Sequence, residues 1–303
     1  MWDTNNQFLS YRSRELSKVK LDSVFKSRTI SLVDAANFSD FLGYVDRVLL
    51  DQPINTVEFP EKSMKGALVL KDTLLHKIYK VTLENGEYCI LKQHRRSLKY
   101  SEKMCMTLLA REFKILQILG SHRNVAYAHG MTWFHDEPAL VLGFESTTTL
   151  KDLLQRVNIV DRLVVQHILE GLTEALAFLQ INEIIHNQIT TENVCLKYNG
   201  KFYTPILVGF SNAIRKCSSR TMTIPQQEKF KDAHHLPVNV RTGKTAPSFK
   251  SDLYSFTLII RRLSRFLSKE SKNNLIELTG NLMATDFRVD LFHQLVNTYL
   301  SNL

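Results

Sequence analysis

Two kinds of hydrophobic spacing divide the chain into a strand-rich part and a helical part. Short runs of strand-forming residues occupy residues 67–70, 77–83 and 88–92, and an Asn-Gly pair between the last two is typical of a β-hairpin turn. Farther along, apolar residues recur at the spacing of a buried helix: Val165, Ile168, Leu169, Leu172, Leu176 and Leu179. The pattern therefore predicts a small β-rich unit followed by a larger helical one.

The first 60 residues follow neither pattern and form a polar, basic extension. Within it, Ser31 followed by Asp34 is typical of a helix start. The apolar residues that come next have helical spacing: Phe38, Phe41, Leu42, Val45, Val48 and Leu49. We expect one amphipathic helix there. Its apolar side either docks on the rest of the chain or faces a partner, and we favour docking because exposed apolar stripes are unfavourable in water.

Composition and charge narrow the class of protein. A chain of 303 residues with 44% hydrophobic and 23% charged residues is ordinary for a globular protein with two structural units. The four cysteines form no C-x-x-C pair, which favours reduced thiols, and no apolar run reaches the roughly 18 residues of a spanning helix. The net charge of +9 would suit nucleic acid or acidic lipid, but no nucleic-acid motif accompanies it. We interpret the charge as a solvated basic surface.

One stretch in the second half carries the candidate chemistry. His186 and Asn193 lie seven positions apart, and Gly209-Phe210-Ser211 follows after a short hairpin. This layout resembles the protein kinase signature, in which H-R-D-L-x-x-x-N precedes D-F-G. In that family the first Asp handles the substrate hydroxyl, while the Asn and the second Asp hold Mg²⁺. Gln188 and Gly209 stand at the two Asp positions here, so the resemblance implies a kinase without either carboxylate.

The resemblance extends into the strand-rich part. Lys92 ends a run that matches V-A-I-K, and Glu112 follows where its helical ion-pair partner belongs. Ile90 matches the small residue that leaves room for adenine, and Leu142 matches the gatekeeper. Both are implied to narrow the nucleotide site. Lys71, Thr73 and His76 replace the three glycines that cover the phosphates. The resemblance therefore implies a vestigial nucleotide site, formed by Lys92, Glu112, Asn193, Ile90 and Leu142.

The family's structural residues are retained in the helical part. Residues 250–256 resemble the S-D-V-Y-S-F of tyrosine kinases and tyrosine-kinase-like domains, and Asp252 there is implied to cap the backbone of the catalytic loop. The resemblance also implies that His186 is a packing and hydrogen-bonding residue. It further implies a hydrophobic column between the lobes formed by Leu116, His186 and Phe210.

Two departures concern the part of a kinase that docks substrates. The A-P-E motif falls near Leu236-Pro237-Val238 and lacks the Glu that would pair with Arg288. The stretch from Asp252 to Arg288 is also too short to hold the helix and long loop that most kinases have there. The resemblance therefore implies a reduced substrate platform.

Together these features predict an α+β fold of the two-lobed protein kinase type. We place the small lobe at residues 61–143 and the large lobe at 144–303, after a helical extension at 1–60. We expect a pseudokinase, a catalytically inactive kinase domain that acts as a protein-binding scaffold or allosteric regulator in intracellular signalling. One alternative is an atypical ATP-binding Ser/Thr/Tyr kinase in which Glu192 or Asp232 supplies the missing acid. A basic nucleic-acid or phospholipid adaptor is the weaker alternative.

The same interpretation sets expectations for ligands, partners and location. We expect no enzymatic activity, no metal and no cofactor, with weak, metal-independent ATP binding as the alternative. The expected partner is a protein, such as an active kinase or another signalling protein, and we expect neither a nucleic-acid partner nor a membrane span. We expect a cytoplasmic protein, with the nucleus as the alternative intracellular location.

Overall fold

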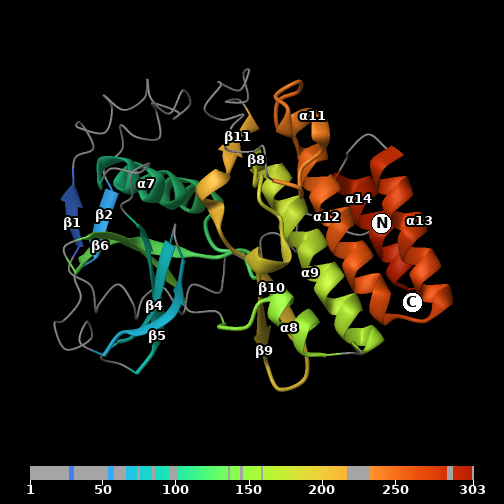
Figure 1. Cartoon of the computed structure of the whole chain (residues 1–303), viewed down its shortest axis with the longest axis horizontal. Coiled ribbons are helices and arrows are strands. Elements are labelled where there is room, and N and C mark those ends of the chain that lie inside the picture. Colours follow the sequence, from blue (N-terminus) through green and yellow to red (C-terminus); the bar gives the residue numbers. More distant parts are fainter. Residues whose placement is uncertain are drawn as a thin grey trace, which may run out of the picture.

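The structure, a computed structural model, has a small lobe built on a β sheet and a larger helical lobe (Figure 1). This α+β arrangement confirms the predicted two-lobed fold. The residues that the structure describes are 27–30, 54–57, 66–73, 76–83, 86–95, 102–135, 137–143, 146–157, 160–216, 233–284 and 289–301.

The small lobe contains a seven-stranded sheet with the order β1-β2-β6-β7-β5-β4-β3. Neighbouring strands are antiparallel except β2 and β6, which run parallel. The predicted hairpin joins β4 and β5, where Gly86 has a φ of 80° that suits glycine. The strands are β1 (Ser27–Ile30), β2 (Ile54–Val57), β3 (Leu68–Asp72), β4 (His76–Thr82), β5 (Tyr88–His94), β6 (Ala128–Phe134) and β7 (Glu137–Gly143).

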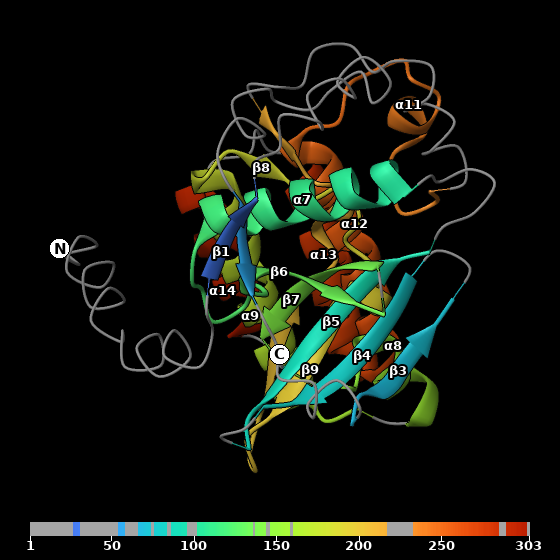
Figure 2. The ribbon, with the colours of Figure 1, turned by 90° about the vertical axis from the view of Figure 1, so that its left-hand side faces the viewer.

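Helix α7 (Glu102–Leu119) packs on one face of this sheet (Figure 2). Alternate residues of a strand point to opposite faces. In β7, Leu140 and Leu142 join the main core together with α7, whereas Ala139 and Val141 join a separate cluster. We call the face that carries this separate cluster the outer face. Its cluster consists of Tyr79, Val81, Leu83, Cys89, Leu91, Phe134, Ala139 and Val141.

Strands β1 and β2 belong to the segment that we interpreted as an extension. They pair with each other, and β2 continues the sheet beside β6 through the pairing of Thr56 with Met131. The sequence analysis missed both strands because four-residue runs are too short for an alternating pattern to stand out. The amphipathic helix that we expected between Ser31 and Leu49 lies outside the described residues.

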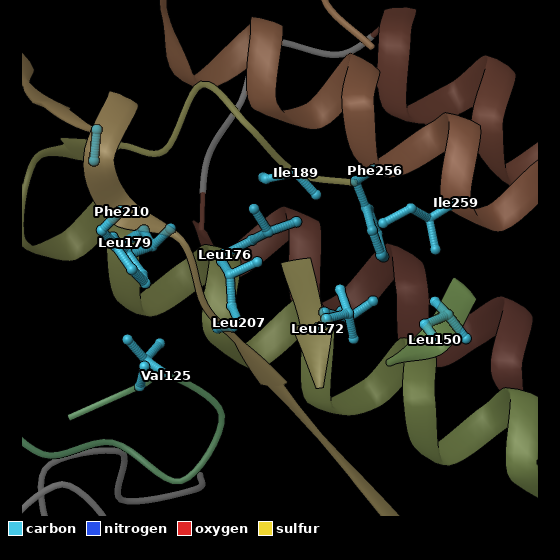
Figure 3. Close-up of a cluster of buried hydrophobic side chains, with 14 of the residues drawn as sticks. Val125, Leu150, Leu172, Leu176, Leu179, Ile189, Leu207, Phe210, Phe256 and Ile259 are labelled. Carbon is cyan, nitrogen blue, oxygen red and sulfur yellow. The ribbon is translucent and has the colours of Figure 1, made fainter. Parts of the chain in front are cut away.

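The large lobe is assembled around α9, whose neighbours include β10, α14 and α12. The predicted buried stripe is confirmed, because Val165, Ile168, Leu169, Leu172 and Leu179 are at most 1% exposed. Figure 3 shows several of these side chains meeting Phe256 and Ile259 of α12 and Leu207 of β10. The helices are α8 (Leu150–Arg156), α9 (Arg162–Ile181), α11 (Val238–Arg241), α12 (Phe249–Leu263), α13 (Lys269–Ala284) and α14 (Val289–Leu300).

Short elements between α9 and α12 carry the candidate site. The strand β8 pairs with β11, and β9 pairs with β10. These elements are β8 (Ile184–Ile185), the 3-10 turn η3 (Thr191–Asn193), β9 (Val194–Tyr198), β10 (Tyr203–Leu207), the turn η4 (Phe210–Asn212) and β11 (Ile214–Arg215).

Helix α12 is followed almost directly by α13. A single 3-10 turn, η6 (Ser264–Phe266), is the only helical element between them, and residues 249–284 are described without a gap. The shortened substrate platform that the spacing predicted is confirmed in this stretch. Among the described helices, none is long and apolar enough to cross a membrane.

Candidate active site

Asp252 holds the loop after β8 from the first turn of α12. Its Oδ2 accepts a hydrogen bond from the backbone N–H of His186 at 2.6 Å, and its Oδ1 accepts one from Asn187 at 2.9 Å. Asp252 is 2% exposed. Burial raises the pKa of this carboxyl to about 7, although the two backbone bonds act in the opposite direction. The position of Asp252 matches the capping role that the resemblance implied.

His186 is fixed in one neutral form. Its Nδ1 accepts from the backbone N–H of Gln188 at 3.1 Å, so its Nε2 carries the proton and donates to the carbonyl of Val208 at 3.2 Å. Burial lowers the pKa of His186 to about 3. The ring also meets the edge of Phe210, with centroids 4.5 Å apart. With both nitrogens engaged, His186 acts as a structural residue rather than a proton shuttle. We refer to Asp252, His186 and Phe210 as the Asp252 frame.

Four amide side chains, three from the loop after β8 and its 3-10 turn and one from η4, meet where the family has its reacting groups. Asn193 donates to the carbonyl of Gln188 at 2.9 Å, and Asn212 donates to the side-chain oxygen of Gln188 at 3.1 Å. Asn187 in turn donates to the carbonyl of Asn212 at 3.1 Å. We refer to Asn187, Gln188, Asn193 and Asn212 as the amide cluster. None of these groups gains or loses a proton near neutral pH, so the cluster offers no general acid or base.

Gly209 lies against the amide cluster in a left-handed backbone conformation, with φ 82° and ψ 53°. A Cβ atom at this position would lie 2.8 Å from Oδ1 and 2.9 Å from Cγ of Asn193. Any side chain at position 209 would therefore require Asn193 to move. At the position where the family has a metal-binding carboxylate, this chain has a glycine. Asn193 lies close to the place that a side chain at this position would occupy.

Lys92 and Glu112 form the predicted ion pair between β5 and α7. The Nζ of Lys92 lies 2.9 Å and 2.6 Å from the two carboxylate oxygens of Glu112, and the residues are 5% and 1% exposed. Glu112 also accepts the backbone N–H of Phe210 at 3.1 Å. A second bond joins α7 to the same segment, because Arg111 donates to the carbonyl of Ala213 at 2.7 Å. The pair therefore holds helix, sheet and the Gly209 segment together without any ligand.

Ile90 and Leu142 are cross-strand partners in β5 and β7. Both lie on the face that also carries Lys92, since Ile90 packs against the main core and Leu142 belongs to it. Leu142 is 8% exposed, and Leu116 of α7 lies in the same core as Phe210. Two branched side chains thus stand opposite each other at the positions that the resemblance assigned to the adenine contact and the gatekeeper.

The turn between β3 and β4 stands where the family's glycine-rich loop would lie. The hydroxyl of Thr73 donates to the carbonyl of His76 and accepts the His76 backbone N–H, both at 3.0 Å. This closes the turn on itself and uses an N–H that a glycine loop would offer to phosphate. Burial, followed by the charges of Lys92 and Lys71, lowers the pKa of His76 to about 3. A neutral imidazole therefore replaces the third glycine.

Of the two acids considered as substitutes, Glu192 is held away from the amide cluster by other contacts. Glu192 pairs with Lys151 of α8 at 3.0 Å and accepts from Thr191 at 3.2 Å. Burial acts to raise the pKa of Glu192, but the bond to Lys151 and further contacts bring it below the usual value. Asp232 lies outside the described residues. Among the residues that are described, no group of three His, Cys, Asp or Glu could hold a metal ion.

Two further residues of the site were missed by the sequence analysis. Asn212 completes the amide cluster, and His235 places its Nε2 2.9 Å from the carbonyl of Asn187. His235 is itself positioned by α12, because Ser255 donates to its carbonyl at 2.6 Å. No spacing in the sequence marks these contacts, which join segments far apart along the chain.

A family model described as the protein kinase domain matches residues 76–288. The chain belongs to the protein kinase family. Within this family, it is 28% identical over 144 residues to the serine/threonine-protein kinase SSK22 of Saccharomyces cerevisiae, a match that covers 48% of this chain and 10% of that protein. It is 29% identical over 120 residues to the yeast MAP kinase kinase kinase SSK2, covering 40% and 8%. This kinase domain thus spans about a tenth of either relative.

Active protein kinases bind ATP together with Mg²⁺, and each of the two requires particular groups at the site. Mg²⁺ in such sites requires carboxylate oxygens. Gly209 has no side chain and Gln188 supplies only an amide. The carboxylate of Glu112, which accepts the backbone N–H of Phe210 next to Gly209, is already bound by Lys92. The side chains at the site therefore do not fit a magnesium–nucleotide complex of the family's usual kind.

Proposed function

We propose that this kinase domain is a pseudokinase, which acts by binding another protein and not by transferring phosphate. The observation that carries the proposal is the amide cluster. Its hydrogen bonds occupy the position at which an active kinase holds the acid for the substrate hydroxyl. An amide cannot accept that proton at neutral pH.

The metal position supports the same proposal. Phosphoryl transfer depends mainly on positioning and on the charge that metal ions supply, and such electrostatic contributions amount to several kcal/mol of the barrier. Gly209 contributes no ligand, and Asn193 adjoins the space that a side chain would need. Nucleotide binding is accordingly absent, or weak and independent of metal.

The retained Asp252 frame supports a role as a binding module. Asp252 and His186 hold the loop of the large lobe, and Glu112, paired with Lys92 in the small lobe, accepts the backbone N–H of Phe210 in the large one. These contacts need no nucleotide. Such a rigid domain can present a surface to a protein partner at little entropic cost on binding. We propose a signalling protein as the partner, such as an active kinase, because the relatives are named as protein kinases, one of them a MAP kinase kinase kinase. The proposed location is intracellular.

One observation favours a second candidate function. The Lys92–Glu112 pair, which contacts the α- and β-phosphates in active kinases, is intact. An atypical kinase that binds ATP through this pair and transfers phosphate slowly is therefore the alternative. It needs an acid from outside the amide cluster, and Glu192 is held by Lys151 instead.

A direct assay separates the two candidates. The purified chain is incubated with labelled ATP and Mg²⁺ or Mn²⁺, with a generic protein substrate, beside its Lys92→Met variant and an active kinase as positive control. The pseudokinase proposal predicts equal, background labelling in the chain and the variant. Metal-dependent labelling that Lys92→Met abolishes would instead establish the atypical kinase.

Nucleotide binding is measured separately by the shift in melting temperature. A ligand that binds the folded state raises the melting temperature according to its concentration relative to Kd. We expect no shift with ATP up to millimolar concentration, and no difference when Mg²⁺ is added. The Ile90→Ala variant, which removes bulk opposite Leu142, is the matched probe and should bind ATP at least as well as the parent chain.

A further inference from the structure

Five basic side chains gather at the corner where α12 leads through η6 into α13, two helices that Figure 1 shows in the large lobe. Residues 261–272 contain these five basic residues and a single acid, Glu270, so five positive charges and one negative give a net charge of +4. Each basic residue is exposed, whereas Leu263 and Ser264 between them are at most 2% exposed. We refer to the five as the basic corner: Arg261, Arg262, Arg265, Lys269 and Lys272.

The cations of the basic corner have no carboxylate to balance them within the part of the chain that the structure describes. None of the five forms an ion pair with a carboxylate there. Glu270 is next to Lys269 along the chain but does not pair with it. Arg262 donates to the hydroxyl of Thr191 in η3 at 2.9 Å, which is a neutral group. The positive charges therefore repel one another without compensation.

Helix formation does not account for the whole arrangement. Arg261 and Arg262 lie in the last turn of α12, where the negative end of the helix dipole favours cations. Lys269 and Lys272 lie within the first four residues of α13, where the positive end of the dipole disfavours them. An arrangement that opposes local stability in this way points to a role in binding.

The backbone under the basic corner is held in place. The hydroxyl of Ser264 donates to the carbonyl of Arg261 at 3.0 Å. At the start of α13, Ser268 accepts the backbone N–H of Ser271 at 3.3 Å, and Ser271 is itself buried. The cations are therefore presented on a fixed scaffold, which keeps the entropic cost of binding a partner low.

We propose that the basic corner binds an acidic segment of a partner protein. Arginine holds a carboxylate through paired hydrogen bonds, and lysine adds a point charge. A membrane surface fits less well, because Leu263, Phe266 and Leu267, the large apolar residues of this stretch, pack in or against the main core. Nucleic acid also fits less well, since its affinity builds up over many phosphate contacts and the basic corner offers only five cations.

The inference rests on the proposed function, because a domain that acts by binding a protein needs a surface for its partner. It names that surface and the charge of the segment that the surface takes. Binding at the basic corner is measured without ATP. Phosphate transfer by the chain would therefore refute the proposed function and leave the outcome at the basic corner unchanged.

Fluorescence anisotropy of labelled peptides tests the proposal on the full chain. The probe is a twelve-residue peptide in which Glu alternates with Ala, and the same peptide with Gln in place of Glu is the neutral reference. The test variant carries Arg265→Glu and Lys269→Glu. The matched control carries Lys201→Glu and Lys244→Glu, which change the net charge equally at exposed lysines elsewhere in the large lobe. Glutamate at position 269 suits the start of α13, so we expect the test variant to keep its fold.

We expect the Glu peptide to bind the parent chain with an affinity that falls as salt is added, and the Gln peptide not to bind. The affinity should fall at least tenfold in the test variant and less than twofold in the control. Equal losses in the two variants would show that the net charge of the whole chain attracts the peptide, which would overturn the proposal. Absence of binding to the parent chain would overturn it as well.

Two further measurements define the place and the class of ligand. A Glu peptide that carries a photoreactive group should crosslink to the unaltered chain within residues 261–272, as mapped by mass spectrometry. Crosslinks confined to other segments would contradict the proposal. Duplex DNA and vesicles that contain phosphatidylserine are titrated under the same conditions. Tighter binding of either one, abolished in the test variant, would assign the basic corner to nucleic acid or to a membrane and overturn the proposal.

Discussion

The Asp252 frame and the amide cluster meet at the loop after β8, yet they are made of different kinds of groups. The frame contains a buried carboxyl and a buried imidazole, each with its pKa moved far from the usual value by its surroundings. The amide cluster contains only neutral side chains that bond to one another and to the backbone. Hydrogen bonds hold both regions in place, but only the frame contains groups that gain or lose a proton as the pH changes.

This difference separates the requirements of folding from those of catalysis. Removing one member of the frame leaves a buried donor or acceptor without a partner, which costs free energy whether or not the protein is an enzyme. Replacing a reacting carboxylate by an amide that forms its own hydrogen bonds leaves no such unpaired group, so it need not lower stability. A kinase domain can therefore lack both carboxylates, at Gln188 and Gly209, while its fold continues to require Asp252, His186 and Lys92.

Acid should have the largest effect on stability while sparing the amide cluster, because it acts on buried histidines both inside the Asp252 frame and outside it. Histidines with lowered folded pKa values, to about 3 for His76, about 4 for His122 and about 3 for His186, contribute stability that is complete above pH 6.5 and lost as the pH falls. Asp252, with its pKa raised to about 7, opposes one of them between pH 3.8 and 7. After a discount for solvent near His76 and His122, we expect about 4 kcal/mol less stability at pH 4 than at pH 6.5.

Urea unfolding at a series of pH values measures this loss. Asp252→Asn removes the opposing group, so its stability should fall more steeply over the same pH range than that of the parent chain. A flat stability profile between pH 6.5 and pH 4 would show that the buried histidines do not govern acid unfolding.

Breaking the frame at neutral pH should have the next largest effect. Asp252→Ala leaves the N–H groups of His186 and Asn187 buried without acceptors, which we expect to destabilise the chain by about 3 kcal/mol. Asp152→Ala is the control, since Asp152 also accepts a backbone N–H bond, from Thr149, but at the less buried start of α8, where loss of a cap costs about 1 kcal/mol. Equal losses in the two variants would contradict the special role of the frame.

The Lys92–Glu112 pair tests whether its role is structural. Removing one partner alone, by Lys92→Met or Glu112→Gln, leaves a buried group unpaired and should destabilise the chain by roughly 2 to 3 kcal/mol. The double variant should lose clearly less than the sum, because it leaves no uncompensated charge. Chemical denaturation of the four proteins gives the coupling energy. Additive losses would mean that the two residues do not depend on each other.

The smallest expected effect concerns the contact between Gly209 and the amide cluster. Gly200 is a matched control, because it too has a left-handed conformation, with φ 92°, but has open space around its Cα. Both Gly→Ala changes incur the backbone cost, about 1 kcal/mol, and Gly209→Ala should lose about 1 kcal/mol more through its contact with Asn193. The excess should shrink in an Asn193→Ser background. If Gly209→Ala and Gly200→Ala have the same melting temperature, Asn193 does not restrict position 209.

The frame could be predicted from sequence and the amide cluster could not, for a physical reason. Asp252, His186 and the Lys92–Glu112 pair stand at positions fixed by short motifs, so their spacing carries the information. The bonds of Gln188 to Asn212 and of Asn187 to His235 depend on how separate segments fold back on each other. Nothing local marks an asparagine or a histidine for such a contact.

The strands of the small-lobe sheet show the same limit of prediction from sequence. Strands β4 and β5 could be predicted from their alternation and the Asn-Gly turn, because a hairpin is a local structure. Strands β1 and β2 could not, since each is four residues long and β2 finds its place only beside β6, far along the chain. Likewise, Ile90 could be recognised as bulky, but its position directly opposite Leu142 follows from the register of β5 and β7.

The close approach of Asn193 to Gly209 also limits what a single substitution at position 209 can achieve. A mutation that restored aspartate at position 209 would place its Cβ against Asn193 before any metal could reward the new carboxylate. Gln188 would still lack the acid, so the first step back would lower stability and return no activity.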